Sequence, residues 1–122
     1  QVIRKGIHQF KSSIHGVWFG GDGNWLFGLS ENRIAWWNSE DGDISVTNVN
    51  GPIQDATLSN GSWMMTGWRQ DLRWSKSQFN SQPDSEIRAE IGHKIVDRAD
   101  EGFWVLDNLG QWSAFAIEGE NS

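Results

Sequence analysis

The chain of 122 residues has the length of a single domain, with nine Trp, no Tyr, no Cys and a net charge of −6. The lack of Cys excludes disulfides and thiol catalysis. The acidic balance argues against nucleic acid and anionic membranes as partners, because both are bound through clustered Lys and Arg. No apolar run approaches the roughly 18 residues of a membrane span, and no signal peptide is visible.

Residues 1–12 contain the only locally basic stretch, with Arg4, Lys5 and Lys11. The sequence starts at Gln1 and not at Met, which favours a fragment or a processed chain. We therefore interpret residues 1–12 as a junction to an upstream shaft or linker. Residues 13–122 are expected to form a single all-β binding domain.

Short segments with alternating or apolar residues follow, and Gly, Asn and Asp punctuate them as in hairpin turns. The expected strands cover residues 16–19, 25–30, 33–38, 44–47, 87–91, 103–106 and 111–115. About nine to eleven short strands predict an all-β fold, a compact antiparallel sandwich or barrel-like domain. No internal repeat with a propeller or solenoid period is apparent, which disfavours repeat lectins.

Residues 75–85 break this pattern, because they are polar, contain Pro83 and show no alternation. Such a stretch predicts an exposed loop.

The sequence contains no motif of a catalytic site. None of the three His residues (His8, His15 and His93) lies in a catalytic context, so we predict that the protein is not an enzyme and needs no cofactor. His8 and His15 would have to converge in space to hold a metal. The acidic segment 40–43 has carboxylates suited to Ca²⁺, but a plain hairpin turn is the simpler interpretation, and no metal site is predicted.

The Trp residues remain as the candidates for ligand binding. Six or seven of the nine are expected in the core, while those beside polar residues (Trp37, Trp68 and Trp74) are expected to be exposed. A large apolar ring with hydrogen-bonding neighbours suits a glycan site. The predicted ligand-binding residues are Trp37, Asn38, Trp68, Arg69, Asp71, Arg73 and Trp74.

Two features resemble the distal receptor-binding tip of a bacteriophage tail fibre or tailspike. One is the pattern of short strands separated by Gly and Asn in residues 25–51. The other is the C-terminal sequence Glu118-Gly-Glu-Asn-Ser122. Many such fibres lose a C-terminal chaperone by cleavage after Ser. The resemblance implies a homotrimer on the virion surface, in the extracellular space. It also implies host attachment through a cell-surface glycan or protein receptor, without membrane insertion.

Two other readings stay open. Gly16-Val-Trp18 is similar to the Gly-x-Trp opening of lipocalin-like barrels, which implies a monomeric barrel that carries a small apolar ligand. A purely structural module is the third possibility, and it predicts that Trp37, Trp68 and Trp74 are all buried.

Overall fold

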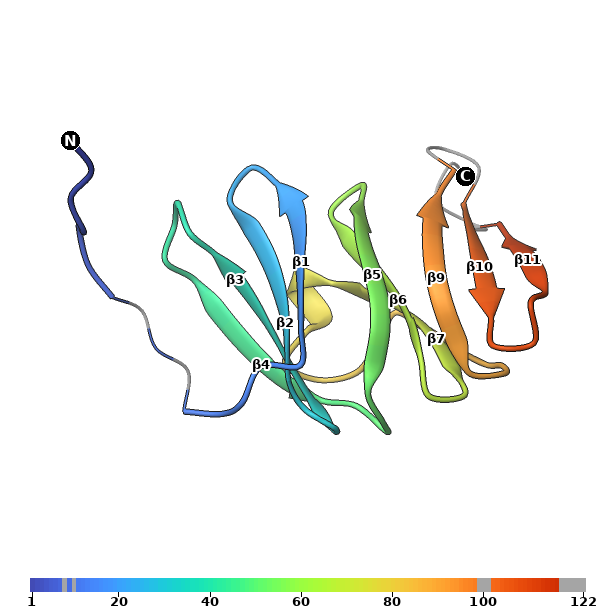
Figure 1. The fold of residues 1–122 in the computed structure, drawn as a ribbon. Coiled ribbons are helices and arrows are strands. Elements are labelled where there is room, and N and C mark those ends of the chain that lie inside the picture. The colour runs from blue at the N-terminus through green and yellow to red at the C-terminus, as the bar shows by residue number, and fades with distance from the viewer. Residues whose placement is uncertain (8, 10, 99–101, 117–122) are drawn as a thin grey trace.

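The computed structural model describes residues 1–7, 9, 11–98 and 102–116, and these form an all-β fold of short antiparallel strands joined by hairpins, as predicted (Figure 1). The described strands are β1 (Gly16–Gly21), β2 (Asn24–Ser30), β3 (Arg33–Asn38), β4 (Ile44–Asn48), β5 (Ile53–Ser59), β6 (Ser62–Gly67), β7 (Gln70–Ser75), β8 (Ser85–Arg88), β9 (Gly92–Asp97), β10 (Phe103–Asp107) and β11 (Trp112–Phe115). A 3-10 turn, η1 (Lys76–Gln78), is the only helical element described, so none of the helical structure in the described ranges could span a bilayer.

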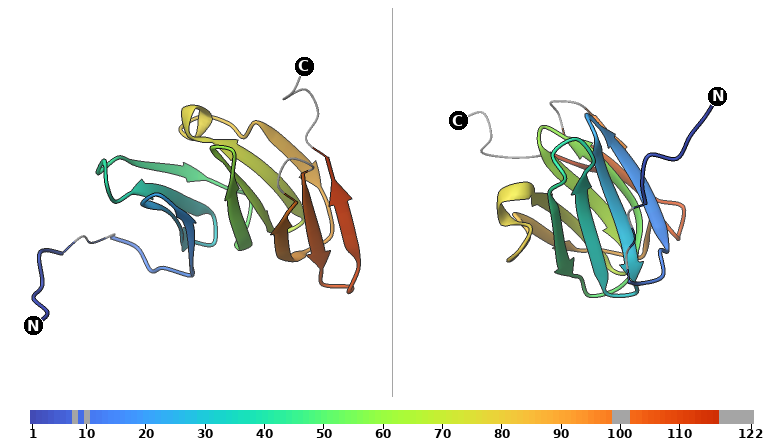
Figure 2. Two further views of the ribbon diagram at one scale, coloured as in Figure 1. Left: turned by 90° about the horizontal axis from the view of Figure 1, so that it is seen from above. Right: turned by 90° about the vertical axis from the view of Figure 1, so that its left-hand side faces the viewer.

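The strands are divided among three sheets in strict chain order, which we call blade 1 (β1–β4), blade 2 (β5–β8) and blade 3 (β9–β11). The first strands of the blades, β1, β5 and β9, lie side by side and run in the same direction (Figure 1). Seen from above, the blades form a fan (Figure 2). This arrangement differs from the single closed sheet that a lipocalin-like barrel needs.

The interpretation that the sequence has no internal repeat was wrong. The blades begin at residues 16, 53 and 92, so the structural unit recurs after 37 and then 39 residues. The expected strand at 87–91 was also misplaced, because β8 ends at Arg88 and β9 begins at Gly92. The chain passes from one blade to the next between them.

The hairpin turns follow from local sequence. Asp22-Gly23 and Asn60-Gly61 adopt positive φ angles of 52° and 77°, and of 51° and 75°, at the β1–β2 and β5–β6 turns. Two consecutive residues with positive φ match the right-handed twist of antiparallel strands, and Asn, Asp and Gly tolerate that conformation best. The predicted turns at both places are confirmed.

Blade 2 is covered on both of its faces, and all six residues of β6 are buried. Trp63 and Met65 point towards blade 1, where Trp36 meets the Trp63 ring edge-on at a centroid distance of 6.2 Å. Met64 points the other way and packs in a second cluster with Ile95 of blade 3. Each junction between blades therefore has its own hydrophobic core.

The loop at residues 75–85 is not simply an exposed polar segment. Phe79 is fully buried, and its ring lies 5.7 Å from Trp36 and 5.2 Å from Trp74, measured between centroids. The indole Nε1 of Trp74 donates a hydrogen bond to the carbonyl oxygen of Gln78 (3.0 Å). The loop thus closes one end of the core between blades 1 and 2.

Each of the two terminal blades has one face on which no other blade packs within the described ranges. On blade 1 this outer face consists of two cross-strand rows, formed by Val17, Phe27, Ala35 and Val46 and by Phe19, Trp25, Trp37 and Ile44. On blade 3 the outer face includes Val96, Trp104 and Trp112. Fewer Trp are buried than expected, because only Trp36, Trp63 and Trp74 are inaccessible, while Trp68, Trp104 and Trp112 are exposed.

Candidate functional site

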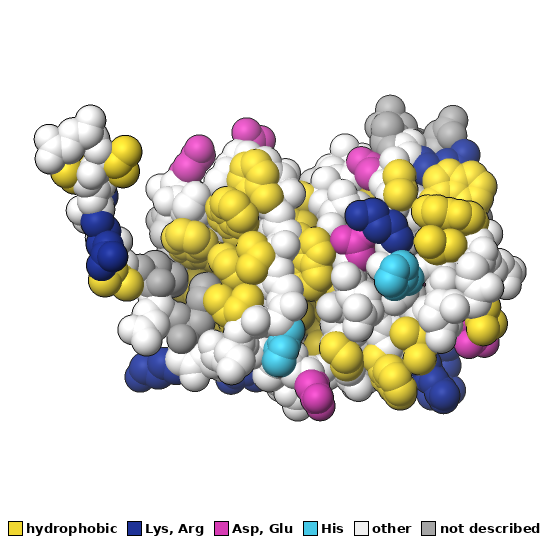
Figure 3. Space-filling view, in the orientation of Figure 1, with side chains coloured by type: hydrophobic (Ala, Val, Ile, Leu, Met, Phe, Trp, Pro, Cys, Tyr) yellow, Lys and Arg dark blue, Asp and Glu magenta, His cyan; other side chains and the backbone are white. Residues whose placement is uncertain are grey.

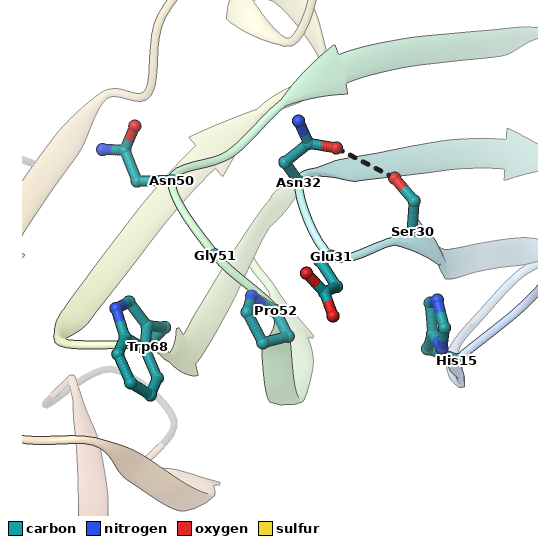
Figure 4. Close-up of a pocket in the computed structure, with 8 residues that line it drawn as sticks. All are labelled: His15, Ser30, Glu31, Asn32, Asn50, Gly51, Pro52 and Trp68. Atoms are coloured by element: carbon teal, nitrogen blue, oxygen red, sulfur yellow. Dashed lines mark hydrogen bonds between the residues drawn. The ribbon is translucent and has the colours of Figure 1, made fainter.

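Four segments meet at one end of the first two blades and form a groove of about 710 Å³ (Figure 4). Because β1 and β5 run in the same direction, the segments that lead into them lie at the same end, together with the β2–β3 and β6–β7 turns. The groove is lined by His15 before β1, by Ser30, Glu31 and Asn32 of the β2–β3 turn, by Asn50, Gly51 and Pro52 of the β4–β5 connector, and by Trp68 of the β6–β7 turn.

Backbone contacts fix these loops against one another. The amide of Val49 donates to the carbonyl oxygen of Asn32 (2.8 Å), and the amide of Trp68 donates to that of Pro52 (3.1 Å). Gly51 and Gly67 allow this close approach. A Cβ on Gly51 would lie 2.6 Å from the Cβ of Trp68, and one on Gly67 would lie 2.2 Å from the carbonyl oxygen of Pro52. The connector therefore holds the β6–β7 turn in place.

Trp68 forms the wall between the groove and a neighbouring side hollow. Its side chain is 47% exposed, and the Arg69 guanidinium lies 5.5 Å from its ring centroid. The side hollow has about 450 Å³ and is also lined by Glu86 and Arg88 of β8. Asn50 lines both spaces, and its Nδ2 donates to Oε1 of Glu86 (3.4 Å). One aromatic ring is thus presented between two polar hollows.

The side hollow also contains a buried donor without a partner. Gln70 is 4% exposed and lines the hollow, and its Nε2 finds no hydrogen-bond partner among the described residues. Buried polar atoms are nearly always satisfied by protein, water or ligand. This Nε2 is buried in the wall of the side hollow and is not exposed to a ligand within it.

The groove and side hollow present both hydrogen-bond donors and acceptors. Carboxylates of Glu31 and Glu86 accept hydrogen bonds, guanidinium groups of Arg69 and Arg88 donate them, and Asn side chains do both. In Figure 4 the Glu31 carboxylate lies between His15 on one side and Pro52 on the other. Across the described ranges there is no cluster of three or more His, Cys, Asp or Glu that could hold a metal ion.

Two of the seven residues predicted to bind ligand lie at this site. Trp68 and Arg69 are neighbours at the β6–β7 turn, and the expected exposure of Trp68 is confirmed. Trp37 is half-buried on the outer face of blade 1, in register with Trp25. Asn38 is buried, and its Oδ1 accepts hydrogen bonds from the amides of Glu40 and Asp41 at 2.9 Å each. Trp37 and Asn38 therefore belong to another part of the molecule.

The predicted exposure of Trp74 is wrong, because Phe79 and the 75–85 loop cover its ring, leaving it 2% exposed. Asp71 is buried too, and its Oδ1 accepts a hydrogen bond from the Thr66 hydroxyl (2.6 Å). Burial raises the pKa of the Asp71 carboxyl above its usual range, and the nearby charge of Asp107 adds to this effect. Arg73 is half-buried on the same side of blade 2.

Sequence reasoning missed the other residues that line the groove and the side hollow. Those of the groove lie in or beside turns, which the sequence marked as connections and not as a site, whereas Glu86 and Arg88 lie in β8. The missed polar side chains include His15, Glu31, Asn32, Asn50, Gln70, Glu86 and Arg88.

The acidic segment is part of a hairpin turn between β3 and β4. In it, Asp43 forms an exposed ion pair with Lys76 (3.2 Å). His15 lies in the groove, whereas His8 lies outside the described residues, as does the C-terminal segment 118–122 that carried the resemblance to fibre tips. The place on a virion and the trimer stay predictions of the sequence.

No protein-family model and no curated protein matches the sequence. The structure is similar to the β-propeller domain of Cps50 (Swd1) from Myceliophteria thermophila, with a TM-score of 0.65, 10% identity, and coverage of 87% of this chain and 37% of that chain. It is also similar to virginiamycin B lyase from Staphylococcus aureus, with a TM-score of 0.54, 17% identity, and coverage of 94% and 45%. The chain thus spans less than half the length of either protein. The fan of blades is therefore a three-bladed segment of a β-propeller fold.

Proposed function

We propose that this protein is a binding module, not an enzyme, and that the groove and side hollow around Trp68 bind a saccharide of a cell-surface glycan. The observation that carries the proposal is the exposed Trp68 ring between two hollows lined by carboxylate, amide and guanidinium groups. Saccharides have apolar C–H faces and a rim of hydroxyl groups. A large aromatic ring complements the faces, and the surrounding donors and acceptors complement the hydroxyls.

The position of Trp68 limits the entropy that binding costs. The ring is fixed at its base by the contact of its Cβ region with Gly51 and by the amide hydrogen bond to Pro52. A preorganised ring loses little freedom when a ligand stacks on it. An open groove of this kind is expected to bind weakly per site, with a dissociation constant of roughly 0.1 to 1 mM.

The test is a glycan array, followed by titration of the best ligand against the variant Trp68→Ala. The matched control is Leu109→Ala, because Leu109 is an exposed apolar residue at the β10–β11 turn, outside the groove. Loss of binding in W68A with retention in L109A supports the proposal. Wild-type protein that binds no glycan, or W68A that binds as well as wild type, would overturn it.

A further inference from the structure

The outer face of blade 1 is an apolar sheet surface that no other sheet of the described residues covers. Both of its cross-strand rows are made only of apolar residues, and Phe19 is 61% exposed. Hydrophobic side chains gather over this blade in Figure 3, and the right-hand view of Figure 2 shows no other sheet in front of it. The N-terminal segment contacts it only at one end among the described contacts, where Arg33 donates to the Ser12 hydroxyl (2.6 Å).

The outer face of blade 3 has a similar character at the other end of the fan. Val96, Trp104 and Trp112 line a shallow hollow of about 440 Å³ with an entirely apolar surface. Arg98 stacks its guanidinium over the Trp104 ring at 4.8 Å. Exposed apolar patches of this kind mark interaction sites.

The two uncovered faces correspond to the two sides of the junctions between blades 1 and 2 and between blades 2 and 3. At each internal junction, one face of a blade packs on the facing side of the next blade. A buried hydrophobic cluster forms between the two faces. The outer face of blade 1 corresponds to the face of blade 2 that packs on blade 1. The outer face of blade 3 corresponds to the face of blade 2 that packs on blade 3. The two faces are therefore suited to pack on each other, but within one chain they lie at opposite ends of the fan (Figure 2).

We propose that these faces bind a second copy of this chain, with blade 1 of each copy packed on blade 3 of the other. Two copies then close a ring of six blades. Closed propellers have about four to eight blades, so two copies fit this range and three copies, with nine blades, do not. The chain covers 37% and 45% of the similar propellers, so two copies correspond to about three-quarters of the first and nine-tenths of the second.

The buried area suits a stable dimer. At about 150 to 250 Å² for a whole aromatic side chain, the exposed parts of the apolar residues on the two faces sum to on the order of 600 Å² per junction. A ring has two such junctions, hence on the order of 1,200 Å² in total, which reaches the lower end of specific interfaces.

The first measurement is the native mass of the 122-residue chain by light scattering, over about 1 to 100 µM. The proposal expects twice the chain mass of 13.8 kDa, decreasing on dilution. A mass of one chain at every concentration overturns it and points to further blades in a longer chain as the cover. A mass of three chains overturns it in favour of the trimer.

Two variants test which faces meet. Phe19→Glu places a charge on the outer face of blade 1, and Trp112→Glu places one on that of blade 3, where Trp112 is 49% exposed. Each alone is expected to be a folded monomer by mass and circular dichroism. Leu109→Glu is the control, because Leu109 is 70% exposed outside both faces, and it should remain a dimer.

Mixing F19E with W112E separates this junction from pairing of like faces. The F19E copy keeps an intact blade 3 face and the W112E copy an intact blade 1 face, so the mixture is expected to regain a dimer through one junction. This dimer forms only at the upper end of the concentration range, because half of the apolar area is buried. A dimer of F19E alone, or no dimer in the mixture, would show that blade 1 does not pack on blade 3 of a second copy.

Discussion

Replacement of Gly67 by Ala tests whether the β4–β5 connector holds the β6–β7 turn. A Cβ at this position would lie 2.2 Å from the carbonyl oxygen of Pro52 and 2.9 Å from Cα of Ile53. Both are backbone atoms, so no side-chain rotation relieves the contact. The connector must move away from the turn by about 1 Å to restore a normal van der Waals distance.

The expected loss of stability has two parts. Overpacking of a close contact costs about 1 to 3 kcal/mol. The shift also weakens the hydrogen bond from the Trp68 amide to Pro52, which adds about 1 kcal/mol. The sum of about 2 to 4 kcal/mol is a large share of the roughly 5 to 15 kcal/mol that stabilise a domain of this size.

The assay is urea unfolding followed by Trp fluorescence, with Gly6→Ala as the control. A Cβ on Gly6 meets nothing within 4 Å, so that variant should unfold like wild type. If G67A is as stable as wild type, the close approach of connector and turn is not the constraint described here, and the fixed position of Trp68 loses its basis.

Two further variants test the core. Phe79→Ala should lower the free energy of unfolding by about 3 to 5 kcal/mol in the same urea assay, because the ring is fully buried against Trp36 and Trp74. A loss of less than about 0.5 kcal/mol, as for an exposed loop residue, would contradict this burial. Asp71→Asn removes a carboxyl whose pKa is raised by burial, so wild type binds this proton more tightly when folded. The stability of wild type relative to D71N should therefore increase as the pH falls from 7 through the raised pKa towards 3.8, and a relative stability that decreases on acidification contradicts this.

Strands β1–β4, β10 and β11 could be predicted because their signals are local, whereas β5–β7 were not assigned. Alternation of apolar residues and the pairs Asp22-Gly23 and Asn60-Gly61 depend on a few neighbouring residues. The exposure of Trp74 could not be predicted in this way. Its cover is Phe79, which lies in a segment whose polar composition indicated solvent and whose burial depends on the packing of two blades.

The blade repeat was present in the sequence but hidden by divergence. Gly23-Asn-Trp25 recurs as Gly61-Ser-Trp63 after 38 residues, and Trp37, the cross-strand partner of Trp25, recurs as Trp74, the partner of Trp63, after 37. The core needs these positions to be large and apolar and the turn needs Gly, while the residues between them are free to differ. Comparison of Trp and Gly spacings at about 38 residues would have revealed the unit.

The groove could not be predicted, because its residues come from turns of two blades that only the fold brings together. Glu31 and Trp68 are separated by a whole blade repeat in the chain, yet they line one space. Only Trp68 and Arg69 could be selected, because a Trp beside a polar residue is a candidate for exposure.

Ring closure and ligand binding make a joint prediction about avidity. A two-fold axis through the centre of a six-bladed ring relates the copies by rotation, so both Trp68 grooves face the same side of the ring. On a dense glycan surface, the wild-type dimer should bind with an apparent affinity at least about tenfold above that of the F19E monomer, because the second contact is intramolecular. For a soluble monovalent glycan, the two proteins should have equal dissociation constants, since Phe19 lies outside the groove. If F19E lost affinity equally for both ligands, the groove itself would depend on dimer formation. If it lost none for the surface, the two grooves would not act together.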